Sequence, residues 1–158
     1  SQGALWEVLS LILVDTNVLV HVINRDSPQH ETCRALVRAV QDGRLLCILL
    51  PQILLEFYSV VTEASLVEQP LPPEQALKII NSLQCIFPVM DPGREALDCL
   101  AEVIAGKPCV GGSVFDAWLA AQMKQLGVNR VCTYNCDDFR GMKGIQPVTP
   151  EDILNNLL

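Results

Sequence analysis

The chain has 158 residues, half of them hydrophobic, and its 18 acidic side chains against 11 basic ones give a formal net charge of −7. This length fits a single domain with one buried core, which we expect to span residues 1–158, with residues 1–10 as a candidate extension. The acidic balance excludes a nucleic-acid binder that relies on bulk positive charge, but it allows an enzyme whose acids hold cations.

The sequence predicts neither a membrane segment nor a disulfide framework. The longest apolar run, residues 45–55, is interrupted by Pro51 and Gln52 and is shorter than the roughly 20 residues of a membrane-spanning helix. The opening residues lack the basic region of a signal peptide. The seven cysteines are odd in number and form no C-x-x-C pair. We therefore expect a cytoplasmic protein with free thiols, no zinc site and no membrane association.

In chain order, the first half of the sequence alternates short apolar runs with amphipathic segments. Asp15, Thr16 and Asn17 end the first apolar run, and Thr16 or Asn17 can cap the helix that follows. Pro28 opens the next helix and Gly43 ends it. We therefore expect a strand at 11–14, a helix at 18–24, a helix between 28 and 43, a strand at 46–50 and a helix at 51–64.

The second half of the sequence continues the same alternation. Pro70, Pro72 and Pro73 mark a loop before the next helix. Ser113 is placed to cap a later helix, which Gly127 ends. We expect a helix at 74–83, a strand at 86–89, helices at 91–105 and 113–126, strands at 130–133 and 146–148, and a short helix from Pro150.

This order of elements predicts an α/β fold with a mostly parallel, five-stranded sheet and helices on both faces. In such sheets, functional sites form beyond the carboxyl ends of the strands. Asp15 and Asp138 follow strands directly. Asp116 lies in the first turn of one helix, and Glu56 lies in the second turn of another. We expect these four acids to face the same edge of the sheet.

All four acids stand inside or directly after apolar runs, where an ionised carboxylate is costly unless something compensates for it. Four converging carboxylates also repel one another, and a divalent cation with oxygen ligands removes this repulsion. Thr16 and Asn17 add groups that can orient a metal-bound water, and Asn135 is a neutral oxygen donor that can support the ligands. The sequence therefore predicts a metal-dependent site, with a nuclease as the favoured activity.

Each acid also has a purely structural interpretation. Asp15 can be a cap at the end of a strand, and Glu56 can be a solvated surface residue. Asp116 fits a capping box with Ser113, in which the acid bonds back to the cap. Asp137 and Asp138 are adjacent and point in different directions. We favour Asp138 as the site acid, because it precedes Phe139, which we expect to anchor the turn.

Four segments together resemble the PIN-domain family, particularly the VapC-type toxins of bacterial and archaeal toxin–antitoxin pairs. In chain order they are LILVDTNVLV, PQILLEF, SVFDAWLAAQMKQLG and VCTYNCDDF. The resemblance covers nearly the whole chain, and the four segments in this order are specific although each alone is weak. It implies a PIN-like three-layer α/β/α sandwich and an endoribonuclease that depends on Mg²⁺ or Mn²⁺.

The resemblance also implies roles for individual residues and for partners. The implied catalytic and metal-binding residues are Asp15, Glu56, Asp116 and Asp138. The implied supporting residues are Thr16, Asn17, Thr133 and Asn135. Members of the family are commonly homodimers, and they are held by an antitoxin helix that lies in a groove beside the site. The high apolar fraction of the chain fits either such a covered surface or simply a dense core.

The hypothetical mechanism is in-line attack on phosphorus by a metal-activated water, which leaves a 5′-phosphate and a 3′-hydroxyl. Lys107, Arg140 and Lys143 are candidate contacts to the RNA backbone, although each can equally be an ordinary solubilising charge.

Three other classes of protein compete with the nuclease. A catalytically silent PIN-like module that recruits a protein partner would suit the apolar composition. A phosphoryl-accepting receiver module would need a lysine after its last strand, which this chain lacks. A haloacid-type phosphatase would need a second aspartate two positions after Asp15, where Asn17 stands.

Overall fold

A four-stranded parallel sheet forms the centre of the computed structural model, which describes residues 11–157. The strand order is β2-β1-β3-β4, and Leu13 of β1 lies opposite Ile48 of β2 and Val131 of β3. The strands are β1 (Ile12–Val14), β2 (Cys47–Ile48), β3 (Arg130–Cys132) and β4 (Gln146–Val148). The candidate extension at residues 1–10 lies outside the described residues.

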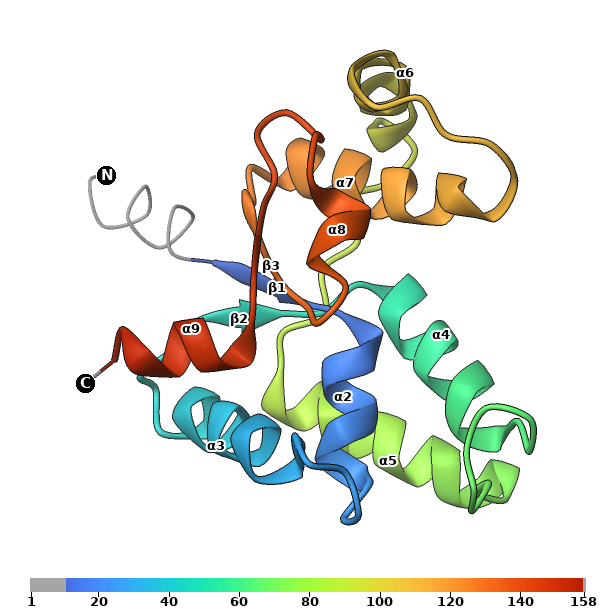
Figure 1. Ribbon diagram of the computed structural model, residues 1–158, viewed down its shortest axis with the longest axis vertical. Coiled ribbons are helices and arrows are strands. Elements are labelled where there is room, and N and C mark those ends of the chain that lie inside the picture. The colour runs from blue at the N-terminus through green and yellow to red at the C-terminus, as the bar shows by residue number, and fades with distance from the viewer. Residues whose placement is uncertain (1–10, 158) are drawn as a thin grey trace.

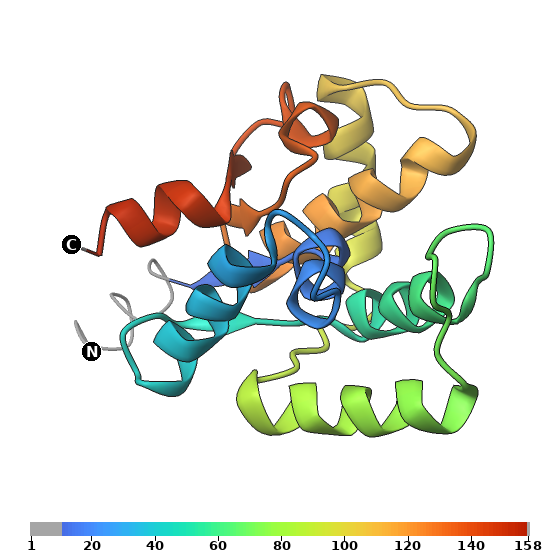
Figure 2. The same cartoon turned by 60° about the horizontal axis from the view of Figure 1, so that its bottom comes forward.

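Helices cover both faces of this sheet (Figures 1 and 2). One layer holds α2 (Thr16–Ile23), α3 (His30–Gln41), α4 (Pro51–Thr62), α5 (Pro73–Ile86) and α9 (Pro150–Asn155), which contact one another. The other layer holds α6 (Ala96–Gly106), the short helix η1 (Gly111–Ser113), α7 (Val114–Leu126) and α8 (Cys136–Phe139). The predicted three-layer α/β/α sandwich with a parallel sheet is therefore confirmed.

The predicted count of five strands is wrong by one. Residues 86–89 do not form a strand, because α5 continues to Ile86 and only Val89 makes a parallel bridge, to Leu49. The Leu49 amide donates to the Pro88 carbonyl at 2.9 Å, and the Met90 amide donates to the Leu49 carbonyl at 2.9 Å. Pro88 has no amide hydrogen to extend the ladder further. The pairing therefore stays at one residue on the outer side of β2.

Prolines and glycines set most helix ends as expected. Proline occupies the first turn of α4, α5 and α9, and Gly43 and Gly127 follow α3 and α7 with positive φ angles of 74° and 73°. The start of α6 differs from the prediction. The Gly93 amide donates to Oδ1 of Asp91 at 3.1 Å, and this turn delays the helix until Ala96.

The core extends from the sheet to the elements that carry the acids. Phe57 of α4 and Phe139 of α8 are fully buried. Burying a side chain of this size stabilises a fold by roughly 1.5–3 kcal/mol. Phe139 therefore anchors α8, as expected, and holds its neighbour Asp138 at the edge of the sheet. Among residues 11–157, no helix is both long enough and apolar enough to cross a membrane.

The order of the strands determines where a site can form. The chain goes from β1 to β2 on one side of the sheet and from β3 to β4 on the other side. The connections therefore diverge between β1 and β3, and in parallel sheets functional sites form at such a switch point, beyond the carboxyl ends of the two strands. Asp15 directly follows β1, and Thr133 directly follows β3.

Candidate active site

Asp15 lies at the switch point between β1 and β3 and is held by three hydrogen bonds. The Thr16 amide donates to Oδ1 at 2.8 Å, the Thr133 hydroxyl donates to Oδ2 at 2.8 Å, and the Asn17 amide group donates to Oδ2 at 3.1 Å. The side chain caps α2 and is only 7% exposed as a residue. Burial raises the pKa of Asp15, although these hydrogen bonds oppose the rise.

Thr133 and Asn17 join the end of β1 to the loop after β3. Nδ2 of Asn17 donates to Oγ1 of Thr133 at 3.1 Å, and the Tyr134 amide donates to Oδ1 of Asn17 at 3.0 Å. Asn135 is exposed, and its backbone amide, rather than its side chain, donates to Oγ1 of Thr133 at 3.0 Å. Of the four predicted supporting residues, Asn17 and Thr133 contact Asp15 through their side chains and Thr16 through its backbone amide, while Asn135 contacts Thr133.

Glu56 is half-buried and is fixed from two sides. The Thr16 hydroxyl donates to its Oε2 at 3.1 Å, and Nε2 of Gln52 donates to its Oε1 at 2.9 Å. Thr16 therefore contacts two of the predicted acids, Asp15 through its amide and Glu56 through its hydroxyl. These contacts argue against a freely solvated glutamate on the surface.

The predicted cap of α7 is wrong. Ser113 occupies the position before the helix but makes no side-chain capping bond. Its hydroxyl instead donates to the Val110 carbonyl at 2.8 Å and accepts from the Val110 amide at 3.1 Å. Asp116 is thus not part of a capping box. Across residues 11–157, no side chain or backbone group hydrogen-bonds its carboxylate.

The pKa of Asp116 is affected by the other three acids, which shows that the acids lie near one another. Burial is the largest cause of its raised pKa, and the charges of Asp138, Asp15 and Glu56 add to the rise in that order. Lys107 opposes the rise, and the pKa that results is about 6. Asp137 is not among these charges, and it pairs with Arg140 instead. This difference supports Asp138, rather than Asp137, as the fourth acid of the site.

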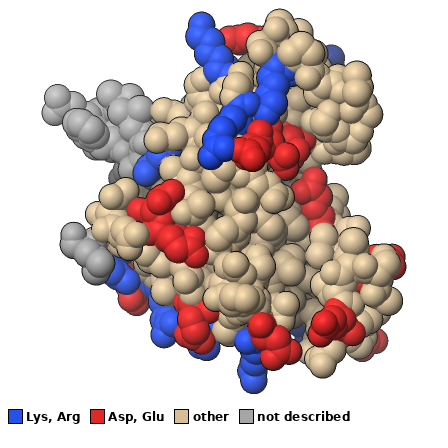
Figure 3. All heavy atoms as spheres, viewed as in Figure 1, with Lys and Arg blue, Asp and Glu red and all other residues tan. Residues whose placement is uncertain are grey.

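Two of the candidate RNA contacts have other partners. The Lys107 ammonium donates to the backbone carbonyls of Asp137 and Asp138, at 3.0 and 2.9 Å, so that it holds α8 against the loop after α6. Arg140 forms the ion pair with Asp137, and Lys143 is exposed. Figure 3 shows basic and acidic side chains side by side over the part of the surface that holds α8.

The acids interact without forming a complete set of metal ligands. Within the described part of the chain, no group of three or more His, Cys, Asp or Glu side chains is arranged to hold a metal ion. The donor set is nevertheless one of carboxylate oxygens, which suit hard divalent cations such as Mg²⁺ and Mn²⁺. All seven cysteines are free thiols.

Three residues outside the predicted set also support the site. Gln52 and Gln122 form a bridge between α4 and α7, in which Nε2 of Gln122 donates to Oε1 of Gln52 at 2.9 Å. The Tyr134 hydroxyl donates to Oε1 of Glu151 at 2.8 Å and so ties the loop after β3 to α9. Two signals were available in the sequence: Gln52 is a polar neighbour of Glu56 at helical spacing, and Gln122 is a polar residue within the apolar run of α7.

A separate hollow of about 730 Å³ lies between the loop that joins α2 to α3 and the loop that joins α4 to α5. None of the predicted site residues lines this hollow.

Comparison with known proteins gives concordant sequence and structural matches. The PIN domain model matches residues 12–144. Ribonuclease VapC48 of Mycobacterium tuberculosis is 31% identical over 137 residues, which cover 84% of this chain and 92% of the relative. Ribonuclease VapC24 of the same organism is 25% identical over 139 residues, which cover 82% of this chain and 89% of the relative.

Solved structures of the same fold include VapBC of Salmonella typhimurium bound to DNA, with a TM-score of 0.65, 21% identity and coverage of 90% of this chain and 98% of that chain. They also include VapC20 of Mycobacterium tuberculosis, described as a toxin that cleaves the sarcin–ricin loop. Its TM-score is 0.60 and its identity is 16%, with coverage of 86% of this chain and 99% of that chain. A toxin–antitoxin complex from Klebsiella pneumoniae has a TM-score of 0.58 and 16% identity, with coverage of 88% of this chain and 97% of that chain. The chain therefore belongs to the PIN-domain family, and its relatives are VapC-type proteins.

Proposed function

We propose that this protein is a metal-dependent endoribonuclease and the toxin of a toxin–antitoxin pair. The observation that carries the proposal is the convergence of Asp15, Glu56 and Asp138 on Asp116, whose charges add to the larger effect of burial and bring the pKa of Asp116 to about 6. Throughout residues 11–157, no Lys or Arg forms an ion pair with that carboxylate, so its charge is left for another cation. The two curated relatives are named as ribonucleases, which supports an RNA substrate.

In this proposal Asp15, Glu56, Asp116 and Asp138 hold Mg²⁺ or Mn²⁺. Their carboxylate oxygens suit such ions, and the mutual repulsion that Asp116 experiences would be relieved by a divalent charge. The bound ion supplies a water of lowered pKa and neutralises the charge that develops on the phosphate.

The surrounding residues orient these acids. Thr133 and Asn17 hold Oδ2 of Asp15, which keeps the carboxylate from rotating, and the Asn135 amide fixes the Thr133 hydroxyl. Thr16 bonds both Asp15 and Glu56 and sets their separation. Lys107 fixes α8 and thereby the backbone of Asp138, so that Arg140 and Lys143 remain the candidates for contact with RNA phosphates.

Cleavage of RNA by an isosteric variant tests the proposal. We expect Asp116→Asn to slow Mg²⁺-dependent cleavage by about 10- to 100-fold or more, because it removes a charged ligand without changing the shape of the side chain. Asp137→Asn is the matched control, since Asp137 is exposed and paired with Arg140, and it should cleave at the wild-type rate. Unchanged cleavage by Asp116→Asn would remove this carboxylate from the mechanism.

The competing function is a silent PIN-like module that recruits a protein. The observation that favours it is that no set of acids within residues 11–157 is arranged as a complete metal site. Calorimetric titration with Mn²⁺ separates the two functions. A failure to bind Mn²⁺ at millimolar concentration would support the module and contradict the nuclease.

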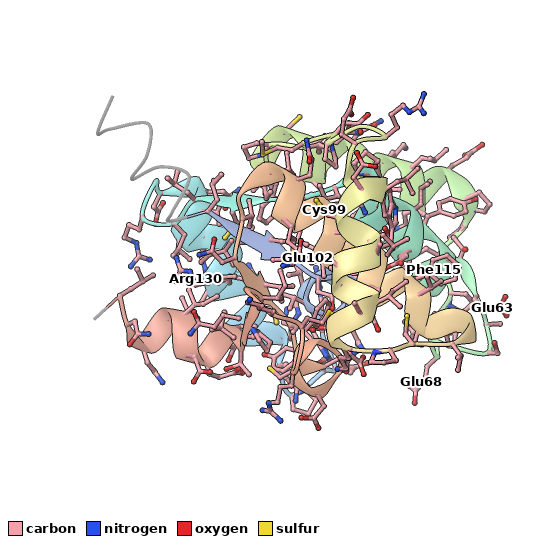
Figure 4. All side chains as sticks on the ribbon, turned by 90° about the horizontal axis from the view of Figure 1, so that it is seen from above. Glu63, Glu68, Cys99, Glu102, Phe115 and Arg130 are labelled. Atoms are coloured by element: carbon pink, nitrogen blue, oxygen red, sulfur yellow. The ribbon has the colours of Figure 1, made fainter. Side chains whose placement is uncertain are left out.

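Two exposed apolar side chains beside the acids support a protein partner. Leu55 precedes Glu56 and is 70% exposed, and Phe115 precedes Asp116 and is 58% exposed. Figure 4 labels Phe115 in the first turn of α7. Large exposed apolar side chains gathered at one place mark interaction sites. We propose that an antitoxin covers this face, and a structural relative from Klebsiella pneumoniae is described as a toxin–antitoxin complex. We also propose that the toxin itself is a homodimer, which light scattering on the purified chain would test.

A further inference from the structure

A chain of side-chain amides connects Glu56 to the opposite helix layer. Nε2 of Gln52, one turn before Glu56 on α4, donates to Oε1 of Glu56 at 2.9 Å. Oε1 of Gln52 accepts from Nε2 of Gln122 on α7 at 2.9 Å. The same two amides also reach backbone carbonyls of α7, from Gln52 to Phe115 and from Gln122 to Trp118, each at 3.4 Å.

The acceptors decide the orientation of both amides. An ionised carboxylate can only accept, so the NH₂ group of Gln52 must face Glu56. The Gln52 oxygen is then left to accept, and Gln122 must present its own NH₂ group. The carbonyls of Phe115 and Trp118 are also acceptors and require the same orientation. A flip of either amide would place two acceptors against each other.

Burial makes this orientation hard to change. Gln122 is 5% exposed as a residue, and it lies on a helix whose neighbouring residues are alanine, leucine and methionine. A buried amide without partners is costly, and water cannot readily replace Gln52 there. Gln122 therefore holds Gln52 in one rotamer, and Gln52 holds Glu56.

The bridge also touches the backbone next to another acid. Phe115, whose carbonyl accepts from Gln52, directly precedes Asp116 in the first turn of α7. One side chain of α4 thus contacts both the carboxylate of Glu56 and the backbone beside Asp116. Together with the bond from Gln122 to Gln52, this contact links the two helices that carry these acids.

We propose that Gln52, oriented by Gln122, is a positioning residue that keeps the Glu56 carboxylate facing Asp116 so that both acids can bind the same divalent cation. The inference rests on the proposed function, in which these acids are metal ligands. Without Gln52, Glu56 keeps only the hydrogen bond from Thr16, and repulsion from the other acids turns its carboxylate toward solvent. The bridge opposes this rotation.

Calorimetric titration of the full chain with Mn²⁺ tests the inference directly. Gln52→Met keeps the length of the side chain but removes the donor, and we expect it to weaken Mn²⁺ binding by about 10-fold. The kcat for RNA should fall while KM stays unchanged, because Gln52 is not expected to contact RNA. Gln125→Met is the matched control, since Gln125 lies on α7 outside the bridge and is exposed.

Two further variants separate the possible failures. Gln52→Asn keeps an amide group, but its side chain is too short to reach Glu56. It should therefore weaken Mn²⁺ binding as much as Gln52→Met does, and it replaces Gln52→Met in the test if that variant does not fold. Glu56→Gln reports whether Glu56 is a ligand. Absence of Mn²⁺ binding by the wild type would overturn the proposed function. Binding that weakens in Glu56→Gln but stays at the wild-type value in both Gln52 variants would overturn the inference alone.

Discussion

At the scale of the residue, burial and neighbouring acids raise the pKa of Asp116. Its pKa is about 6 in the folded chain against an ordinary value of 3.8. Between these two values the folded state keeps a proton that the unfolded state releases, so the free energy of unfolding falls as pH rises through this window. Asp116 thus destabilises the metal-free protein near neutral pH, which is the expected cost of a charge held ready for a cation.

This reasoning predicts that Asp116→Asn stabilises the metal-free protein more at about pH 7 than at about pH 4. Asparagine cannot ionise, and the extra gain should be about 1 kcal/mol once solvent screening of a half-exposed group is allowed for. Urea unfolding in the presence of a chelator measures this difference. Asp137→Asn, at an exposed position, should show no such gain. An equal gain at both pH values for Asp116→Asn would contradict the origin of the pKa shift.

The acids were predictable from sequence because each stands at a fixed place relative to an apolar run. Asp15 ends β1, and Asp138 precedes the buried Phe139. The bridge from Gln52 to Gln122 was not predictable, since it joins positions 70 residues apart that meet only when α4 packs beside α7. The expected capping box failed because the Ser113 hydroxyl is engaged by the backbone of Val110.

At the scale of the element, α8 has four residues and needs support from outside itself. Phe139 anchors it by burial, and Lys107 bonds two of its carbonyls. A helix this short is not stable alone, because few backbone hydrogen bonds offset the cost of ordering it. The position of Asp138 therefore depends on contacts made by distant residues.

We accordingly predict that Lys107→Met loosens α8. The loss of a charged donor to two carbonyls at a partly exposed position should cost about 1 kcal/mol, and it should increase amide hydrogen exchange at residues 136–140. Lys143→Met is the control, because Lys143 is exposed and makes no contact with α8 carbonyls. If exchange at residues 136–140 were unchanged in Lys107→Met, Lys107 would return to its predicted role as an RNA contact.

The helices were easier to predict than the strands. Proline fixes the first turn of α4, α5 and α9 through its own backbone angle, which is a local effect. Residues 86–89 look like a strand by composition, but their pairing depends on how far α5 extends and on Pro88. Strand pairing is a tertiary property, and the sequence of one segment does not determine it.

At the scale of the whole molecule, the sheet brings together residues from both halves of the chain. The parallel register of β1 and β3 places Asp15 and Thr133 at the same edge, and Asp116 and Glu56 reach that edge from helices in opposite layers. The net charge of −7 surrounds this edge with a field that repels RNA. Binding of RNA must therefore depend on a few local cations rather than on the surface as a whole.

This distribution of charge predicts a shallow dependence of RNA affinity on salt. Lys107 is bonded to backbone carbonyls. Arg140 is exposed although it pairs with Asp137, and Lys143 is exposed, so about two side chains are available for phosphates. The slope of log affinity against log salt concentration should then be about −1.4, at roughly −0.7 for each contact with a single strand. Fluorescence anisotropy with the cleavage-deficient Asp116→Asn variant and a short labelled RNA measures this slope.

Combining that variant with Arg140→Met and Lys143→Met should bring the slope close to zero, because no other phosphate contact is proposed. A slope several times steeper in the parent variant would mean that RNA lies across a different, more basic face of the protein.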